Sequence, residues 1–201
     1  TWDVSLITDM ENIFKDKITF SDDIGNWDVS NVTNMKRMFF DAKMFNADIS
    51  NWDVSNVTVM NGMFQCQVDC NDNPSIFNQD ISGWDVSEVT DMGRMFQNEK
   101  SFNQDLSTWD VSKVTQMEYM FFNNISFNQN LSSWDVSSLT QANSMFNGAT
   151  IFNQNLSSWD VSNLWTFNNM FQFCPLSDEN KCAIHISWST NSNWNYDWSD
   201  T

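Results

Sequence analysis

The stretch FNQDLSTWDVSKVTQMEYMF, residues 102–121, recurs along the chain with few changes. Its WDVS element is found seven times, at steps of 25, 25, 32, 25, 25 and 25 residues. The seven copies begin at Trp2, Trp27, Trp52, Trp84, Trp109, Trp134 and Trp159. A period of this length is typical of solenoids, in which each repeat is one supersecondary unit that stacks on its neighbours. We therefore predict a seven-copy solenoid over residues 1–173, with an insertion loop at 65–76, followed by a C-terminal capping segment at 174–201.

The local pattern of one repeat predicts a strand followed by a helical turn. Apolar and polar residues alternate over 109–112, which places Trp109 and Val111 on one side of a short strand. The following segment, 114–121, spaces its Val, Met and Phe residues as one helical face. Such a crossover joins parallel strands in the right-handed sense. The predicted fold is an α/β repeat solenoid, a right-handed coil with a parallel β-sheet on one face and short helical turns on the other.

The longer pattern FNQDLSxWDVSxVTxMxxMFxxA resembles the repeat of the BspA-type leucine-rich-repeat surface-protein family. The resemblance covers residues 1–173. It implies a leucine-rich-repeat-like solenoid on secreted or surface-anchored proteins, with a role in adhesion. The family has no catalytic motif, so the resemblance implies no catalytic residues in this chain.

Composition excludes several classes of function. The chain has 9 Lys plus Arg against 26 Asp plus Glu, and its net charge of −17 would repel nucleic-acid phosphates. It contains no run of about 20 apolar residues, so we expect no direct membrane insertion. A repeat offers the same side chains at every coil, whereas catalysis needs an irregular constellation, so we expect no enzyme. The start within a repeat, at TWDVS, predicts a piece of a longer protein.

These observations predict a non-catalytic extracellular or cell-surface protein for adhesion or recognition. Its partner would be an extracellular protein or a glycan. The alternative is self-assembly, as a structural subunit of an extracellular filament, sheath or virion fibre.

One acidic position recurs in every WDVS element and is the candidate binding surface. It is occupied by Asp3, Asp28, Asp53, Asp85, Asp110, Asp135 and Asp160. Stacked coils would bring these carboxylates close enough to repel one another. Either the serine two residues later donates hydrogen bonds to each carboxylate, or cations such as Ca²⁺ lie between the coils. No other cofactor is expected, and the column would favour basic or cation-bridged partners.

A second polar column is predicted from the FNQ element, whose asparagines would form a buried ladder that satisfies backbone groups of adjacent coils. They are Asn46, Asn78, Asn103, Asn128 and Asn153. Five N-x-S/T sequons are candidate N-glycosylation sites. They begin at Asn31, Asn56, Asn124, Asn130 and Asn155.

The four cysteines fall in two local pairs. Their spacing predicts disulfides Cys66–Cys70 and Cys174–Cys182, and hence an oxidising compartment, with a zinc site as the alternative. The repeat ends after Phe173, and the alternating segment AIHISW, residues 183–188, predicts a last strand that closes the core. The aromatic residues of 194–198 would form either a strap over this cap or an exposed segment that docks another module.

Overall fold

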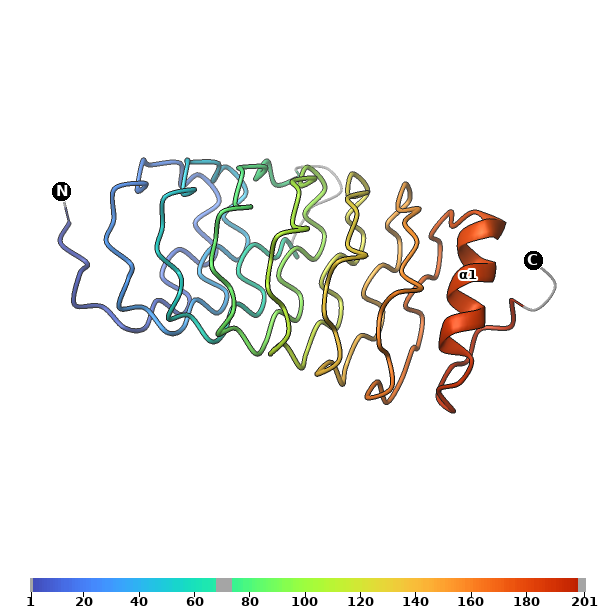
Figure 1. Ribbon diagram of the computed structural model, residues 1–201. Helices are drawn as coiled ribbons and strands as arrows, with labels where there is room; N and C mark the ends of the chain where they lie inside the picture. Colours follow the sequence, from blue (N-terminus) through green and yellow to red (C-terminus); the bar gives the residue numbers. More distant parts are fainter. Residues whose placement is uncertain (1, 68–73, 199–201) are drawn as a thin grey trace.

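The computed structural model describes residues 2–67 and 74–198. The chain winds into a stack of coils, with the N-terminal coil at one end and helix α1 (Asp178–Trp188) at the other (Figure 1). Isolated parallel bridges join equivalent residues of consecutive coils, such as Asp91 to Gln116 and Gln116 to Gln141. The bridge from Val59 to Asp91 spans 32 residues, so the insertion leaves the register of the stack unchanged.

The Met- and Phe-rich segment of each repeat carries a ladder of hydrogen bonds between coils. In one coil the N–H groups of Met92, Arg94, Phe96 and Asn98 donate to carbonyl oxygens of the next coil, at 2.7–3.0 Å. The N–H groups between them close turns on their own coil: Met95 donates to the carbonyl of Met92 at 3.2 Å. Alternate N–H groups are therefore satisfied by the next coil and by the same coil.

These tandem turns replace the predicted helical turns. Positive φ angles recur along the segment, for example at Arg94 (59°) and Asn98 (57°). A positive φ at the third residue of a turn is typical of type II turns and interrupts an α-helix. The predicted helical turns are therefore wrong. The spacing of apolar residues in 114–121 is compatible with both structures, because these turns direct the same side chains inward as a helix would.

The predicted parallel sheet is also wrong. In the described ranges the parallel pairing consists of isolated bridges at the residue before the first Met of a repeat, or before Ala142, and no strand forms at WDVS. The N–H of Trp109 donates to Leu106, that of Val114 donates to Val111, and that of Ser112 to the Asp110 side chain. Local turns thus occupy the donors that strand pairing at WDVS would require. The stacked coil is retained, but the α/β architecture is not.

The core is a set of aromatic columns. Trp52, Trp84, Trp109, Trp134 and Trp159 are buried. From Trp52 onward, each indole N–H in this column donates to a carbonyl of the preceding coil; the bond from Trp109 to Ile81 is 3.1 Å long. Trp27 is only half-buried, and Trp2 is exposed.

Phenylalanines form two further columns beside the tryptophans. Phe96 stacks on Phe121 of the next coil with ring centroids 5.7 Å apart, and on Phe102 of its own coil at 4.0 Å. Phe102 in turn lies 6.3 Å from Phe127. Each ring therefore contacts partners within and between coils, which ties the register of the stack to the packing of its core.

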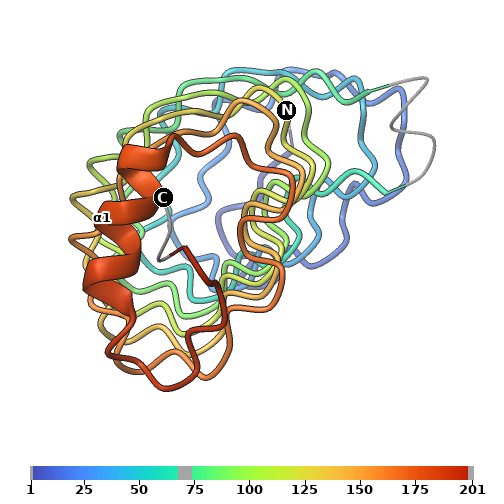
Figure 2. The same ribbon diagram turned by 90° about the vertical axis from the view of Figure 1, so that its right-hand side faces the viewer.

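Helix α1 closes the C-terminal end of the stack (Figure 2). It corrects the strand predicted over 183–188: Ile184 and Trp188 are buried one turn apart, whereas Ile186 is exposed. Ser177 caps the helix by accepting the N–H of Asn180 at 3.3 Å. Trp188 stacks on Trp159 at 6.1 Å, so the helix continues the aromatic column for one more layer.

The residues after α1 form a strap against this cap, which is one of the two arrangements considered from the sequence. Trp194 packs edge-on against Phe167 and Trp188, with centroids 5.1 and 5.4 Å away. Tyr196 accepts the N–H of Phe171 through its hydroxyl oxygen, at 2.8 Å.

Gly148 offers a test of the tandem turns, because it has a φ of 75° and a Cβ there would overlap Oδ1 of Asn123. We expect Gly148→Ala to lower the free energy of unfolding by about 1–3 kcal/mol. Thermal unfolding measures the loss. Gly83→Ala is the matched control, because a Cβ at Gly83 meets nothing within 4 Å. Equal melting temperatures for the two variants would contradict this account of the turns.

Candidate interaction surface

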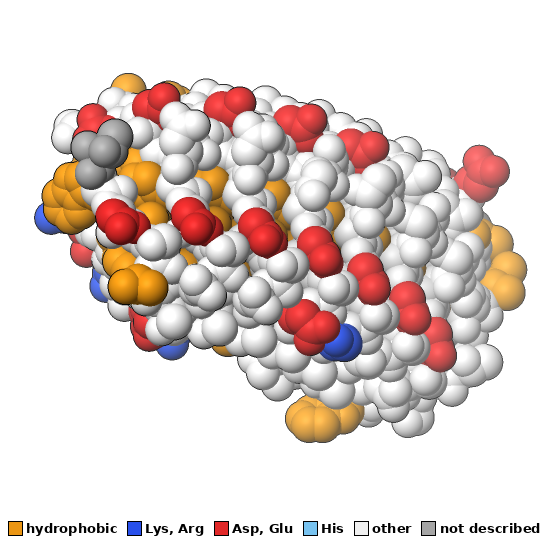
Figure 3. Space-filling model, turned by 60° about the vertical axis from the view of Figure 1, so that its left-hand side comes forward, with side chains coloured by type: hydrophobic (Ala, Val, Ile, Leu, Met, Phe, Trp, Pro, Cys, Tyr) orange, Lys and Arg blue, Asp and Glu red, His pale blue; other side chains and the backbone are white. Residues whose placement is uncertain are grey.

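The acidic column predicted from WDVS lies fully on the surface, as one of two rows of acidic side chains along one face (Figure 3). Oδ1 of each aspartate accepts the backbone N–H of the serine two residues later, at 3.0–3.1 Å. For Asp3, Asp28 and Asp53 the serine hydroxyl also donates, at 2.6–2.7 Å. Of the two explanations considered for the column, this is the hydrogen-bonded one.

These hydrogen bonds favour the ionised form of Asp28 and Asp110. The hydroxyl of Ser30, followed by its N–H, lowers the pKa of Asp28 below the ordinary 3.8. Ser112 does the same for the pKa of Asp110. Repulsion from Asp3 raises the pKa of Asp28, but by less than the serine lowers it. Local hydrogen bonds therefore outweigh repulsion between neighbouring coils.

A second acidic column, which the sequence analysis did not single out, runs parallel to the first. Its members are Asp23, Asp48, Asp80 and Asp105, continued by Asn130 and Asn155. The side-chain Oδ1 of each accepts the N–H of the residue two positions later, at 2.9–3.0 Å. The signal was present in the sequence, because DIS, DLS and NLS repeat the Asp-x-Ser spacing of WDVS.

The FNQ ladder exists, but it is not buried. Oδ1 of Asn103 accepts the N–H of Asn128 in the next coil at 3.0 Å, and Nε2 of Gln129 donates to the Asn103 carbonyl at 2.9 Å. The same bonds recur along the column, and all five asparagines are half-buried or exposed. At the C-terminal end Asn180 of α1 takes the place of the glutamine, donating to the carbonyl and Oδ1 of Asn153 at 3.1 and 2.8 Å. The column thus links adjacent coils through hydrogen bonds at the surface.

The five sequon asparagines differ in exposure. Asn124 is fully buried, and its Oδ1 accepts the N–H groups of Ser126 and Phe127, so a glycan there is incompatible with this structure. Asn31 and Asn56 are exposed, and each donates its Nδ2 to a serine carbonyl of the preceding coil at 2.8 Å. The remaining two, in the second column, are exposed.

The cysteines agree only in part with the predicted pairing. Cys66 is disulfide-bonded and buried, while its predicted partner Cys70 lies outside the described residues. Cys174 and Cys182 are free thiols, so the disulfide predicted between them is wrong. The Cys174 thiol instead donates to the carbonyl of Phe146 at 2.8 Å, and the contacts of α1 and the strap hold the cap.

Burial raises the pKa of the Cys174 thiol to about 12. At pH 8 the reactive thiolate would then be about 10⁻⁴ of the population. We expect iodoacetamide to modify Cys182 in the native protein, leave Cys174 intact, and modify both in urea. Peptide mass spectrometry measures this, with Cys182→Ser as the control that should remain unmodified in the native state. A disulfide-linked peptide containing both cysteines would contradict the structure.

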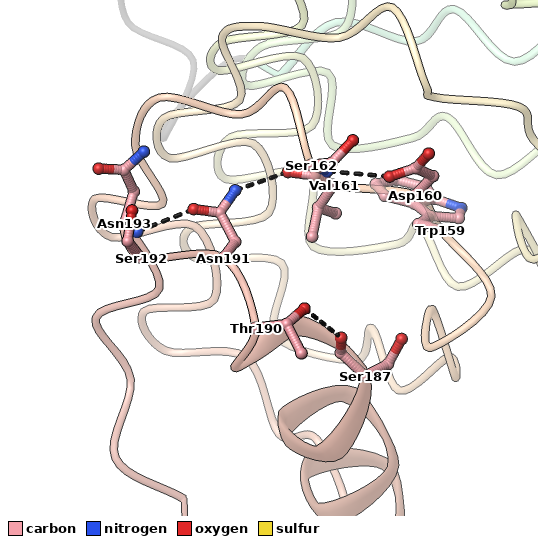
Figure 4. A pocket seen from close by; sticks show the side chains of 9 residues that line it. All are labelled: Trp159, Asp160, Val161, Ser162, Ser187, Thr190, Asn191, Ser192 and Asn193. Atoms are coloured by element: carbon pink, nitrogen blue, oxygen red, sulfur yellow. Dashed lines mark hydrogen bonds between the residues drawn. The ribbon is translucent and has the colours of Figure 1, made fainter.

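A polar pocket of about 410 Å³ lies where the first acidic column meets the cap (Figure 4). Asp160 and Ser162 line one side, and Ser187 and Thr190 of the cap line the other. Asn191 crosses between them and donates to the carbonyl of Val161 at 2.7 Å. Trp159 also borders the pocket, but it is buried in the core and offers no stacking face.

Two further features of the described residues bear on partners. Residues 2–67 and 74–198 contain no group of three or more His, Cys, Asp or Glu side chains arranged to hold a metal ion. In the same ranges no helix is long and apolar enough to cross a bilayer.

Comparison with known protein families gives one match. The family described as "Mycoplasma protein of unknown function, DUF285" matches residues 1–76 and 68–183, which together cover most of the chain. The chain belongs to this family. Its description assigns DUF285 proteins no function, and no curated protein matches the chain.

Proposed function

We propose that this protein is a non-catalytic extracellular surface protein that recognises a protein or glycan partner through its acidic face. The observation that supports this most is the pair of parallel acidic columns on that face, in which each side chain accepts a hydrogen bond from the residue two positions later. Such a surface holds its side chains in place before binding, which lowers the entropic cost of association. The resemblance to BspA-type repeats supports the same role.

Electrostatic complementarity favours a basic partner surface, or an anionic one bridged by cations. Lys113 lies beside the first column, but its charge is already paired with Glu88 at 2.6 Å. The face therefore keeps a net negative charge. The polar pocket at the end of the column adds hydroxyl and amide groups that suit a hydroxyl-rich ligand such as a sugar.

The chain itself provides a charge-neutral replacement for the aspartates. Asn130 and Asn155 make the same side-chain turn as the aspartates of their column, at 2.9 Å. Replacing aspartates of the first column by asparagine should therefore remove charge and keep the turns. The test variant is Asp85→Asn, Asp110→Asn, Asp135→Asn and Asp160→Asn combined.

The labelled protein would be applied to a glycan array and to immobilised extracellular-matrix proteins, at low salt and at about 0.15 M salt. We expect saturable binding that weakens with salt, and about tenfold weaker binding for the variant. The second column belongs to the same face, so Asp23→Asn, Asp48→Asn, Asp80→Asn and Asp105→Asn combined should weaken binding as well. The control is Asp178→Asn with Glu179→Gln, two exposed acidic residues of α1 outside both columns, which should leave binding unchanged. Absence of saturable binding, or a first-column variant that binds as well as the wild type, would contradict the proposal. Ordered polymers of the wild-type protein would instead favour the structural-subunit alternative.

A further inference from the structure

The polar pocket at the end of the first acidic column has two unlike walls (Figure 4). Each earlier aspartate of this column is followed, one coil further on, by another aspartate. Asp160 is the last of them, and the next layer of the stack is the cap, so that Asp160 and Ser162 lie across the pocket from Ser187 and Thr190. The volume of about 410 Å³ is within the range of small-molecule sites.

Of the residues that line this pocket, only Asp160 is charged. Its Oδ1 accepts the N–H of Ser162 at 3.0 Å, and this N–H, followed by the Ser162 hydroxyl, lowers the pKa of Asp160 below the ordinary 3.8. Within residues 2–67 and 74–198 no Lys or Arg forms an ion pair with Asp160. The pocket therefore favours a cationic ligand, because an anion would meet a carboxylate and no positive charge.

The other lining groups are mainly acceptors, because their donors are already used. The Ser187 hydroxyl and the side-chain amides of Asn191 and Asn193 donate to backbone carbonyls at 2.7–3.2 Å. The Thr190 hydroxyl donates to another carbonyl at 3.4 Å. Each of these side chains keeps an oxygen that accepts hydrogen bonds. The ligand that fits is therefore rich in hydrogen-bond donors and carries one positive charge.

Three other cations fit this pocket less well. Ca²⁺ takes about 6–8 oxygen ligands, several of them carboxylates, and the pocket has one carboxylate. A guanidinium pairs best with both oxygens of a carboxylate, but Oδ1 of Asp160 is already bonded to Ser162. A lysine side chain would place its ammonium against Asp160 and leave the oxygens of Ser187 and Thr190, across the pocket, without donors.

An amino sugar supplies donors for both walls, because it carries an ammonium group at one ring position and hydroxyl groups at others. We propose that this pocket binds an amino sugar whose amino group is not acetylated, with the ammonium against Asp160 and ring hydroxyls against Ser187 and Thr190. This inference rests on the proposed function, since it names the sugar that the end of the acidic face would recognise in a glycan partner.

The experiment uses the full chain and, as probe, a trisaccharide of β-1,4-linked glucosamine. It is performed at about 0.15 M salt, which screens diffuse attraction to the acidic columns. We expect the probe to shift the NMR signals of the Asn191 and Asn193 side-chain amides in a saturable titration. Absence of a saturable shift would overturn the proposal.

Two probes of related structure test the two parts of the ligand separately. The N-acetylated trisaccharide has the same rings without the charge, and trilysine has three side-chain ammonium groups without the rings. We expect each to bind at least about tenfold more weakly than the glucosamine trisaccharide. Equal binding of the acetylated sugar would show that the charge is not recognised, and equal binding of trilysine would show that the ring hydroxyls are not. Either result would overturn the proposal.

Variants of each wall complete the test. Asp160→Asn removes the charge and keeps a side chain that makes the same turn at Asn130 and Asn155, and we expect about tenfold weaker binding. Thr190→Val removes an acceptor from the opposite wall and should weaken binding about fivefold. Asp178→Asn is the matched control, because Asp178 is an exposed aspartate of α1 outside the pocket, and binding should be unchanged. Equal loss in the two aspartate variants would overturn the proposal.

Failure of this inference is distinguishable from failure of the proposed function. Partners that bind the acidic face on the arrays, together with a glucosamine trisaccharide that leaves the Asn191 and Asn193 signals unchanged, would contradict this inference alone. A trisaccharide that binds at Asp160, together with arrays on which no partner binds, would support this inference and contradict the proposed function.

Discussion

Trp109→Ala is expected to lower the free energy of unfolding by about 3–5 kcal/mol, as large core truncations do. Trp109 is buried in the middle of the stack, where coils on both sides depend on its packing. The substitution also removes the indole N–H that bonds to the carbonyl of Ile81, which then keeps only the N–H of Trp84 as its donor. In a linear array such damage weakens the contact of each coil with its neighbours rather than one isolated site.

Urea unfolding followed by tryptophan emission measures this loss. Trp109→Phe should cost less, about 1–3 kcal/mol, because it retains an aromatic ring and loses the indole N–H with only part of the buried volume. Trp165→Ala is the control: this side chain is 67% exposed, and its loss should change stability by about 0.5 kcal/mol or less. If Trp109→Ala were as stable as the Trp165 variant, the column of tryptophans would not be the core of the fold.

The periodicity of the sequence was enough to predict the stack and its interior, but not the backbone conformation. Burial of Met117 and Phe121 follows from their spacing whether the segment is a helix or a series of turns, because both place these side chains on one side. What decides between them is the positive φ at Tyr119 and Asn123, for which the sequence gives little signal at a tyrosine.

The WDVS element failed as a strand for a different reason. Alternation of apolar and polar residues predicts which side chains face inward, and Trp109 and Val111 do face inward. It does not predict which groups accept hydrogen bonds from the backbone N–H groups. In this element the acceptors are the Asp110 side chain and the carbonyls of two local turns. The same Asp-x-Ser chemistry was proposed for the acidic column, so the turn signal was present but was not weighed against the strand.

Residues 183–188 were predicted as a strand because the apolar spacing of so short a segment fits both a strand and a helix. Ile184, Ile186 and Trp188 alternate as in a strand, but Ile184 and Trp188 also lie four residues apart, as on a helix face. Ser177 followed by Asp178 and Glu179 is a helix N-terminal signal that favours the second possibility. The disulfide between Cys174 and Cys182 was predicted from proximity in sequence, whereas α1 places the two thiols on separate elements.

Glu99 is expected to make the protein less stable as the pH rises from about 5 to about 8. It occupies the position that Ala42 and Ala149 occupy in other repeats, and it is fully buried. Neither carboxylate oxygen has a well-aligned hydrogen-bond partner in the described residues. Burial raises the pKa of Glu99 from 4.5 to about 8, and weaker interactions with Ser75 and the N–H of Phe77 reduce the rise only in part.

The sign of the effect follows from which state holds the proton. Between pH 4.5 and 8 the folded protein keeps the Glu99 proton and the unfolded chain has lost it, so unfolding releases a proton and is favoured by rising pH. The stabilisation is fully present below pH 4.5 and falls by about 1.4 kcal/mol per pH unit, or about 5 kcal/mol by pH 8. Two aspartates of the acidic column, Asp28 and Asp110, have the opposite effect, and at lower pH. The lowered pKa values of Asp28 and Asp110 favour the folded state above about pH 4, and this contribution is lost as the pH falls below that value.

Urea unfolding at a series of pH values from 5 to 8 tests the role of Glu99, with Glu99→Gln as the decisive variant. Glutamine keeps the size and polarity of the side chain and does not titrate, so its free energy of unfolding should be nearly constant over this range. Glu88→Gln is the matched control, because Glu88 is a half-exposed glutamate on the surface and its replacement should leave the wild-type slope intact. A wild-type protein equally stable at pH 5 and pH 8, or a Glu99→Gln variant that keeps the slope, would show that the buried carboxyl is not protonated in the folded state.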